Sequence, residues 1–220
     1  MVIPAYNEGQ NIGRLIHEVE SRGFPVLVVD DGSKDATALN SQAVGAEVLV
    51  TRVNQGKGAA LRRGFSWLLQ RKYAAVIVMD SDGQHDPHEL DLFLAALNTG
   101  APVVVGNRLT DPQGMSLIRR VTNRFMSWVI SSVNRQQTPD SQCGYRALTR
   151  EVLEKISLNT SRFEIESEIL LEASRAGFRI SSIPIRCVYR HEISRIHPIR
   201  DTVRFFSFLF KYLTRCHCSK

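Results

Sequence analysis

Short apolar runs alternate with amphipathic stretches through the first half of the chain. The runs are rich in β-branched residues and predict strands over residues 2–4, 25–29, 47–50, 74–79 and 102–105. The stretches between them predict helices over 10–22, 35–42, 57–70 and 87–97. Asp86 and Pro87 are suited to the N-cap and the first position of the last of these helices. Alternation of strands with helices predicts an α/β fold around a mainly parallel sheet.

Two amphipathic helices are predicted after Gly106. The apolar residues of the first recur at helical spacing: Leu117, Val121, Phe125, Trp128 and Val129. The second covers residues 198–213, and its apolar stripe consists of Ile199, Val203, Phe206, Phe210 and Leu213. Further aromatic residues widen that stripe, so this helix either packs as core or lies in a membrane interface. We expect an α/β domain over 1–190 and a basic amphipathic segment over 191–220, placed at a membrane surface.

The charge of the chain is unevenly distributed. The 220 residues carry a formal net charge of +6, and 22 of the 28 basic residues are Arg. Residues 1–174 hold 18 basic and 20 acidic residues, whereas 175–220 hold 10 and 2. The basic end favours an anionic surface or a polyphosphate ligand. The share of hydrophobic residues, 43%, is ordinary for a globular protein and excludes collagenous and disordered classes.

The cysteines and the apolar runs exclude several further classes. Four cysteines without a CxxC pair indicate neither a zinc site nor a disulfide framework, which fits a reducing compartment. Residues 1–4 lack the basic start of a signal peptide, so we expect none. The longest uncharged candidate for a membrane span, residues 125–134, has 10 residues, and a span needs about 18. We therefore expect a protein that does not cross a membrane.

Acidic and aromatic residues follow three of the predicted strands. In an open parallel sheet, ligands bind beyond the carboxyl ends of the strands. The first strand is followed by residues 4–8, the second by 30–33 and the fourth by 80–85. Asp80 and Asp82 can hold Mg²⁺ or Mn²⁺ and leave room for substrate phosphates, although a solvated turn before the next helix is an alternative.

The other strand-end residues fit a nucleotide. Asp30 and Asp31 can accept hydrogen bonds from a ribose or a base, and Tyr6 can stack on a base; turn formation and ordinary packing are the alternatives. The glycine-rich run at 54–58 does not make a phosphate loop, because Thr51 and Gly58 stand where Gly and Ser or Thr are required. No dinucleotide GxGxxG motif follows a strand, which argues against ATPases and dehydrogenases.

Taken in order, these segments resemble the family 2 glycosyltransferases. The segments are VIPAYNE at 2–8, VVDDGSKD at 28–35, NQGKGAALRRG at 54–64, MDSDGQHDP at 79–87, GNR at 106–108, QCGYRAL at 142–148 and FEIESEIL at 163–170. Within that family the chain is most similar to dolichyl- and polyprenyl-phosphate mannosyl or glucosyl transferases. The resemblance implies a GT-A fold, a Rossmann-like sheet flanked by helices, with a nucleotide-sugar donor, a divalent metal and a lipid-phosphate acceptor.

The resemblance also implies roles for single residues. The nucleotide pocket would be lined by Pro4, Ala5, Tyr6 and Glu8, with Asp30 or Asp31 near the base and ribose. The DxD element would be Asp80, Ser81 and Asp82, and the metal ligands Asp80, Asp82 and Gln84. The transferring group and the acceptor phosphate would face Arg108, Arg119, Arg120 and Asn123. Arg190 and Arg195 would close over the donor phosphates, although the family has Lys in place of Arg195 and a Gly that residues 192–194 lack.

The chemistry of the acceptor decides whether a base is needed. A phosphate monoester, with a second pKa of about 6, is already anionic at neutral pH and can attack the sugar directly. A hydroxyl acceptor needs a general base, and Asp140 is the candidate, with a turn role after Pro139 as its alternative. The alternating Glu164, Glu166 and Glu168 suit a helix start and receive no catalytic role.

These patterns favour an inverting, metal-dependent hexosyltransferase at the cytoplasmic face of a membrane. Its donor would be of the GDP-mannose or UDP-glucose class and its acceptor a polyprenyl phosphate, with Mg²⁺ or Mn²⁺ as cofactor. Transfer to a saccharide or protein hydroxyl is the alternative within the class, and a non-catalytic module that binds membrane surfaces is the alternative outside it. Nucleic acid is not an expected partner, because the aromatic residues of 205–210 suit lipid better than bases. A membrane subunit or a homo-oligomer is compatible with the sequence.

Overall fold

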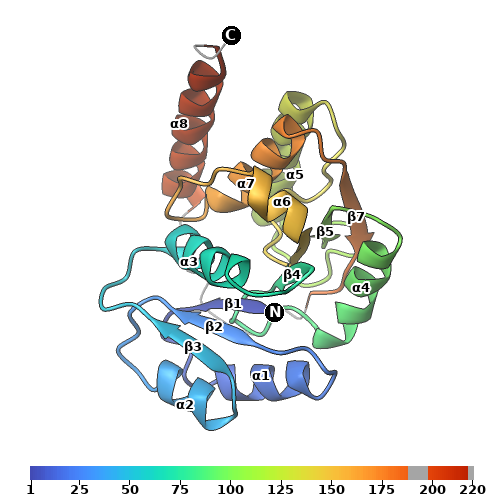
Figure 1. Cartoon of the computed structure of the whole chain (residues 1–220). Helices are drawn as coiled ribbons and strands as arrows, with labels where there is room; N and C mark the ends of the chain where they lie inside the picture. Colours follow the sequence, from blue (N-terminus) through green and yellow to red (C-terminus); the bar gives the residue numbers. More distant parts are fainter. Residues whose placement is uncertain (188–197, 218–220) are drawn as a thin grey trace. The chain divides into compact units, whose positions relative to one another are not determined.

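A seven-stranded sheet, in the order β3-β2-β1-β4-β6-β5-β7, organises most of the chain (Figure 1). The computed structural model describes residues 1–187 and 198–217. They belong to two compact units, residues 1–189 and 190–220. The sheet belongs to the first unit. Its strands are β1 Val2–Ala5, β2 Leu27–Asp30, β3 Glu47–Val50, β4 Ala75–Val78, β5 Val103–Asn107, β6 Arg146–Thr149 and β7 Ile180–Pro184.

Helices connect these strands in nearly every step of the chain. In the first unit they are α1 Ile12–Glu20, α2 Thr37–Ala43, α3 Lys57–Leu69, the 3₁₀ turn η1 Pro87–Glu89, α4 Leu90–Asn98, α5 Leu117–Asn134, α6 Arg150–Lys155 and α7 Ile165–Arg175. All five predicted strands and all four predicted helices of the first half are confirmed. The side chain of Asp86 accepts a hydrogen bond from the backbone N–H of His88, which confirms the predicted N-cap.

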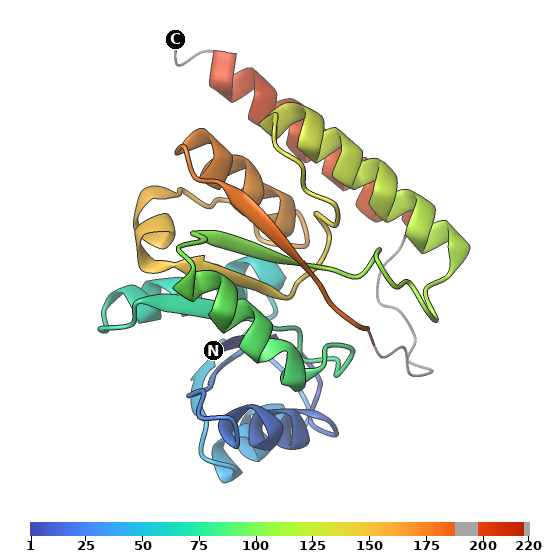
Figure 2. The ribbon, with the colours of Figure 1, turned by 90° about the vertical axis from the view of Figure 1, so that its right-hand side faces the viewer.

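One strand runs against the others. β6 pairs antiparallel with both β4 and β5 and lies between them, whereas β1, β2, β3, β4, β5 and β7 run parallel. The sheet is thus mainly parallel, as predicted. β6 is not marked in the sequence because it presents only two consecutive apolar residues, Ala147 and Leu148. β7 is also not marked, because its run ISSIP is half polar and lies at the sheet edge beside β5 (Figure 2).

The core lies on both faces of the sheet. α1 and α2 lie on one side of β1–β3 and α3 on the other, while α4 packs on β5 and β6 (Figure 1). Because helices cover both faces, the central strands are continuous apolar runs. Their side chains are fully buried, among them Ile3, Val28, Val29, Val103 and Val104. This arrangement leaves the carboxyl ends of β1, β2 and β4 at one edge, where their loops meet.

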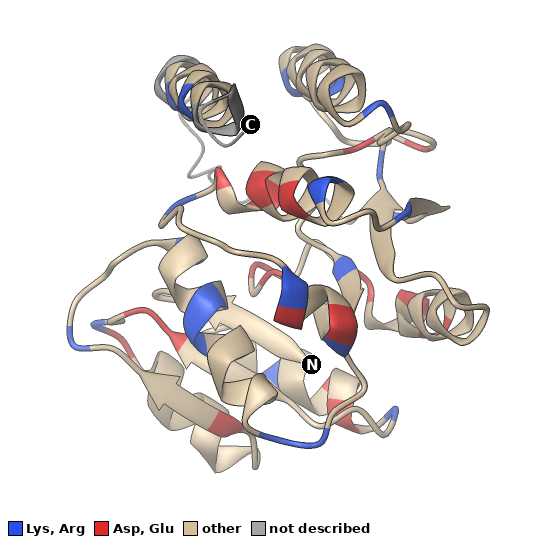
Figure 3. Cartoon of the chain, turned by 45° about the horizontal axis from the view of Figure 1, so that its top comes forward, with Lys and Arg blue, Asp and Glu red and all other residues tan. Residues whose placement is uncertain are grey.

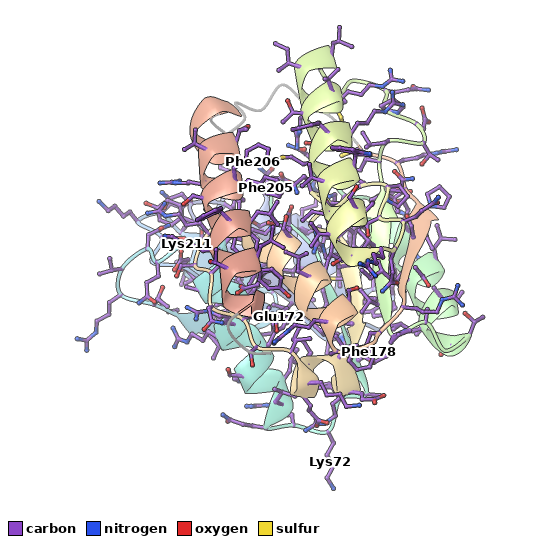
Figure 4. All side chains as sticks on the ribbon, turned by 90° about the horizontal axis from the view of Figure 1, so that it is seen from above. Lys72, Glu172, Phe178, Phe205, Phe206 and Lys211 are labelled. Atoms are coloured by element: carbon purple, nitrogen blue, oxygen red, sulfur yellow. The ribbon has the colours of Figure 1, made fainter. Side chains whose placement is uncertain are left out.

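The second unit contains the helix α8, Pro198–His217, which confirms the helix predicted over 198–213. Within this helix the rings of Phe205 and Phe206 pack edge to face, with 5.3 Å between the ring centroids (Figure 4). The rings of Phe208 and Tyr212 lie 6.0 Å apart. Among the residues the structure describes, no helix combines the length and the apolar character that crossing a bilayer requires. The location of this segment at a membrane interface stays a prediction.

Candidate active site

The loops after β1 and β2 are locked together by hydrogen bonds. The backbone N–H of Asn7 donates to Ser33 Oγ at 2.9 Å, and Asn7 Oδ1 accepts from the backbone of Lys34 at 2.8 Å. The N–H of Glu8 donates to Thr37 Oγ1 at 2.8 Å. Asn7 has a φ of 54°, a conformation that these contacts hold in place. The two loops therefore form one rigid wall at the sheet edge.

The predicted nucleotide-binding residues of β1 lie in or beside this wall. Pro4 and Ala5 are buried within β1, and the carbonyl of Ala5 accepts from the N–H of Asp31. Tyr6 and Glu8 are half-buried in the loop that follows. The structure brings these four residues together at the carboxyl end of β1, where the sequence predicts a nucleotide pocket.

The paired carboxylates after β2 have different partners. Asp30 Oδ1 accepts from the backbone N–H of Ser33 at 2.8 Å and so closes its own turn. Asp31 accepts from the backbone N–H groups of Gln55, at 3.0 Å, and of Gly56, at 2.6 Å. Asp31 therefore anchors the glycine-rich loop before α3 against the end of β2. Both aspartates are buried. Their hydrogen bonds fix the backbone of the turn after β2 and of the glycine-rich loop, next to the predicted site for the base and ribose.

The first carboxylate of the DxD element is held by a lysine that the sequence analysis did not identify. Lys57 Nζ lies 2.5 Å from Asp80 Oδ1 and 2.5 Å from Glu166 Oε1. Lys57 is the first residue of α3, and Glu166 lies in the first turn of α7. The rejected phosphate-loop motif contains this lysine. Its role toward the carboxylates is not visible in the sequence, because Glu166 is 109 positions away.

Burial and opposite charges compete at this cluster. Burial alone disfavours the ammonium form of Lys57, but the carboxylates of Asp80 and Glu166 outweigh it and raise the lysine pKa above its usual range. Burial opposes ionisation of Asp80 and is the largest single influence, but the nearby positive charges, Lys57 first among them, together outweigh it and lower the pKa of Asp80 to about 2. Lys57 and Asp80 are therefore both charged at neutral pH.

Backbone packing also fixes Asp80. An added Cβ at Gly144 would overlap the Asp80 carboxylate, so only glycine leaves room there. The loop that carries Gly144 is held by the fully buried Arg146, whose Nε donates to the carbonyl of Cys143 at 2.6 Å. The same guanidinium donates to the carbonyls of Ser141 and Glu166. The QCGYR segment thus joins the DxD loop to α7.

The predicted metal ligands share one loop. Asp82 Oδ1 accepts from the backbone N–H of Gln84 at 3.0 Å, and both residues are half-buried; Ser81 between the aspartates is buried. The Asp80 side chain keeps 26% of its surface exposed. Within residues 1–187 and 198–217, no three His, Cys, Asp or Glu side chains converge on one point. Two accessible carboxylates and an amide oxygen nevertheless fit a hard cation that takes its remaining ligands from phosphates.

Arg108 and Asp140 form a buried ion pair. Arg108 Nε donates to Asp140 Oδ2 at 2.8 Å and Arg108 Nη2 to Asp140 Oδ1 at 2.9 Å. Both oxygens of the predicted base therefore accept from an arginine, and this geometry favours positioning of Arg108 over proton abstraction.

The other residues predicted at the acceptor phosphate lie on α5. Arg119 and Arg120 are half-buried in its first turns, and Asn123 is buried on its inner face. The Nε of Arg120 is buried without a hydrogen-bond partner among the described residues. Arg190 and Arg195, predicted to close over the donor, lie outside the described residues.

The outer face of α5 is apolar and exposed. It presents Leu117, Ile118, Val121, Phe125 and Trp128, of which Trp128 is 65% exposed. The rings of Phe125 and Trp128 stack at 6.1 Å. This helix therefore combines basic residues near its start with an apolar surface, a pairing that the sequence analysis did not assign to an interface.

Several known proteins are similar to this chain in sequence. Residues 1–157 match the model of glycosyl transferase family 2. The chain is 32% identical to the polyprenol monophosphomannose synthase of Mycolicibacterium smegmatis, over 84% of this chain and 75% of that protein. It is 33% identical to the undecaprenyl-phosphate mannosyltransferase of Micrococcus luteus, over 86% of this chain and 83% of that protein. The chain belongs to glycosyl transferase family 2, a family of nucleotide-sugar-dependent enzymes, which confirms the predicted resemblance.

A solved structure shows the same fold. Glucosyl-3-phosphoglycerate synthase of Mycobacterium tuberculosis, crystallised with Mn²⁺, UDP and glucosyl-3-phosphoglycerate, superposes with a TM-score of 0.70 at 22% identity. The match covers 87% of this chain and 71% of that one. Together with the mixed, mostly parallel sheet, it confirms the predicted GT-A fold.

Proposed function

We propose that the protein transfers a hexose from a nucleoside-diphosphate sugar to a polyprenyl phosphate at a membrane surface. The observation that carries the proposal is the juxtaposition at the sheet edge. There the Asp80–Asp82 loop follows β4, beside the interlocked loops of β1 and β2. A nucleotide against one wall would extend its diphosphate toward the two carboxylates. The names of the two relatives, a polyprenol monophosphomannose synthase and an undecaprenyl-phosphate mannosyltransferase, support the choice of a polyprenyl phosphate as acceptor.

The donor site uses the strand-end loops. Tyr6 and Glu8 would face the nucleoside, and Asp31 would hold the glycine-rich loop beside it. Asp80, Asp82 and Gln84 would hold Mg²⁺ or Mn²⁺, which when bound neutralises charge on the departing diphosphate. GDP-mannose and UDP-glucose represent the two donor classes proposed. Arg190 and Arg195 would add positive charge at the same phosphates.

The acceptor site uses arginine instead of a base. A lipid phosphate is anionic at neutral pH, so the chain must position it and does not need to remove a proton. Arg119 and Arg120 stand at the start of α5, where the helix dipole also favours an anion, and Asn123 lies one turn further on. The Arg108 guanidinium, oriented by Asp140, would face the transferring group. Inversion follows from one direct displacement at the anomeric carbon.

The proposed location is the cytoplasmic surface of a membrane, without insertion across it. The exposed apolar face of α5 would enter the interfacial layer, and its basic residues would meet anionic headgroups. The amphipathic α8 would add a second contact of the same kind. This location would bring the phosphate of a polyprenyl lipid to the protein without removing its tail from the bilayer.

Transfer of labelled hexose tests the proposal. We expect D80A and D82A each to abolish metal-dependent transfer to polyprenyl phosphate, whereas full activity without metal would refute the mechanism. A thermal-shift panel of GDP, UDP and ADP with Mn²⁺ identifies the donor class, because a nucleotide that binds the folded state raises the melting temperature. No shift with any of the three would contradict a nucleotide-sugar donor.

A further inference from the structure

The buried lysine of the candidate active site lies between two carboxylates of unequal function. Asp80 belongs to the DxD loop, whereas Glu166 comes from α7 and is not among the predicted ligands. Lys57 Nζ is 2.5 Å from an oxygen of each. The side chains of Lys57 and Glu166 are 13% and 7% exposed, so water screens neither of them well.

The charge balance of this cluster depends on Glu166. With Lys57, Asp80 and Glu166 all ionised, the cluster carries a net charge of −1. Without the Glu166 charge, Lys57 would neutralise Asp80, and the cluster would present no net charge to a cation. A lysine next to a metal carboxylate thus weakens cation binding unless a second carboxylate compensates for it.

We propose that Glu166 is a positioning residue that, by pairing with Lys57, keeps the net charge of the cluster negative, so that the DxD loop can bind a divalent cation with the nucleotide. The inference rests on the proposed function for its cation and donor. Glu166 itself touches neither. Its effect passes through the ammonium group of Lys57.

Hydrogen bonds to neighbouring residues fix the position of Glu166 relative to the DxD loop. Its backbone carbonyl accepts from the buried Arg146, which also holds the loop of Gly144 against Asp80. Two residues further along α7, Glu168 accepts from the N–H groups of Asn159 and Thr160, both at 2.9 Å. Figure 3 shows the acidic residues of α7 in red. Glu168 holds the loop at residues 159–160 and, within the described part of the chain, contacts no charged group of the site. Glu166 differs from it because its carboxylate contacts Lys57.

A purely structural role is the competing explanation, since the pair also joins α3 to α7. Charge and structure can be separated with two variants. E166Q keeps the size of the side chain and brings the net charge of the cluster to zero. The double variant K57Q/E166Q lacks the ion pair altogether but restores the net charge of −1.

The test measures Mn²⁺ binding by the full chain in the presence of GDP or UDP, from the electron paramagnetic resonance signal of unbound Mn²⁺. E166Q is expected to weaken Mn²⁺ binding about tenfold or more, because a full charge close to the cation is lost. E164Q, the same change two residues earlier and outside the cluster, should stay within about twofold of the parent. K57Q/E166Q should return to within about threefold of it.

Two results would overturn the inference: parental Mn²⁺ affinity in E166Q, or equally weak binding in E166Q and in the double variant. If E166Q does not fold, the folded double variant decides, since retained affinity supports the charge argument and lost affinity contradicts it. Failure of the parent to bind Mn²⁺ with either nucleotide is a different result, because it refutes the proposed function together with the inference.

Discussion

The guanidinium of Arg108 and the carboxylate of Asp140 face each other in two parallel hydrogen bonds of 2.8 and 2.9 Å, with 4% and 0% of their side chains exposed. A third bond, from the backbone N–H of Arg108 to Asp140 Oδ2, closes the arrangement. The pair connects the end of β5 to the segment before β6. Its geometry fixes the direction of the guanidinium.

This pair predicts a large effect of removing one partner. D140A leaves the Arg108 charge buried and uncompensated, so we expect the free energy of unfolding to fall by about 3–5 kcal/mol. The double variant R108M/D140L, which removes both charges, should be less destabilised than D140A. Urea unfolding followed by circular dichroism measures both. A D140A variant within about 0.5 kcal/mol of the parent would show that the pair is unimportant for stability.

Gly144 provides a second test of how Asp80 is placed. A Cβ in G144A would overlap the Asp80 carboxylate, which would have to turn away from Lys57 and so weaken a largely buried ion pair. We expect a lower melting temperature, because Lys57 loses one of its two carboxylate partners, and Mn²⁺ binding with nucleotide weakened about tenfold. G13A is the matched control, because a Cβ there meets only ordinary contacts. Equal Mn²⁺ affinity in the two variants would contradict a fixed Asp80.

The strand pattern made most of the fold predictable. The continuous apolar runs of β1, β2, β4 and β5 reflect burial on both faces and mark those strands directly. β6 and β7 were not predicted, each for a different reason. β6 has only two consecutive apolar residues because its first position is the buried Arg146, which hydrogen-bonds to backbone carbonyls, and β7 lies at an edge where polar residues are tolerated.

Stability should depend on pH through His85. The ring of His85 stacks on Tyr145 at 5.0 Å, and burial, partly offset by the Asp80 carboxylate, lowers the pKa of His85 to about 4. Between about pH 6.5 and 4 the unfolded chain therefore binds a proton that the folded chain does not. The contribution of neutral His85 to stability is complete above pH 6.5 and is lost as the pH falls toward 4.

The variant H85F isolates this contribution, since Phe keeps the stacked ring and cannot titrate. We expect the free energy of unfolding of the parent, relative to H85F, to fall by on the order of 1–3 kcal/mol from pH 7 to pH 4.5. Urea titrations at several pH values, with a chelator present, measure the difference. Parallel pH profiles of the two proteins would contradict the buried, neutral histidine.

The exposed face of α5 predicts membrane binding. L117S/W128S removes two large exposed side chains, so flotation with phosphatidylglycerol vesicles should decrease while the free energy of unfolding stays within about 0.5 kcal/mol. L92S/L94S, a change of two exposed leucines on α4, serves as the control and should float like the parent. Unchanged flotation of L117S/W128S would exclude α5 as a membrane contact.

The candidate site was predictable where it depends on order along the chain. Residues at strand ends must meet at one edge, so Tyr6, Asp31 and Asp80 could be assigned to one site from the sequence. The contact of Lys57 with Glu166 could not be predicted, because it depends on how α3 and α7 pack against each other. The same holds for Asp140, whose oxygens are occupied by a partner 32 positions away.

The most direct test of the account is the initial rate of hexose transfer to polyprenyl phosphate in detergent micelles. Labelled GDP-mannose and UDP-glucose are the donors, Mn²⁺ is added, and unphosphorylated polyprenol serves as the matched acceptor. The account predicts a labelled lipid phosphate from one donor, no product from polyprenol, and loss of product with chelator or in D82A. Absence of product from both donors, or equal transfer to polyprenol, would contradict it.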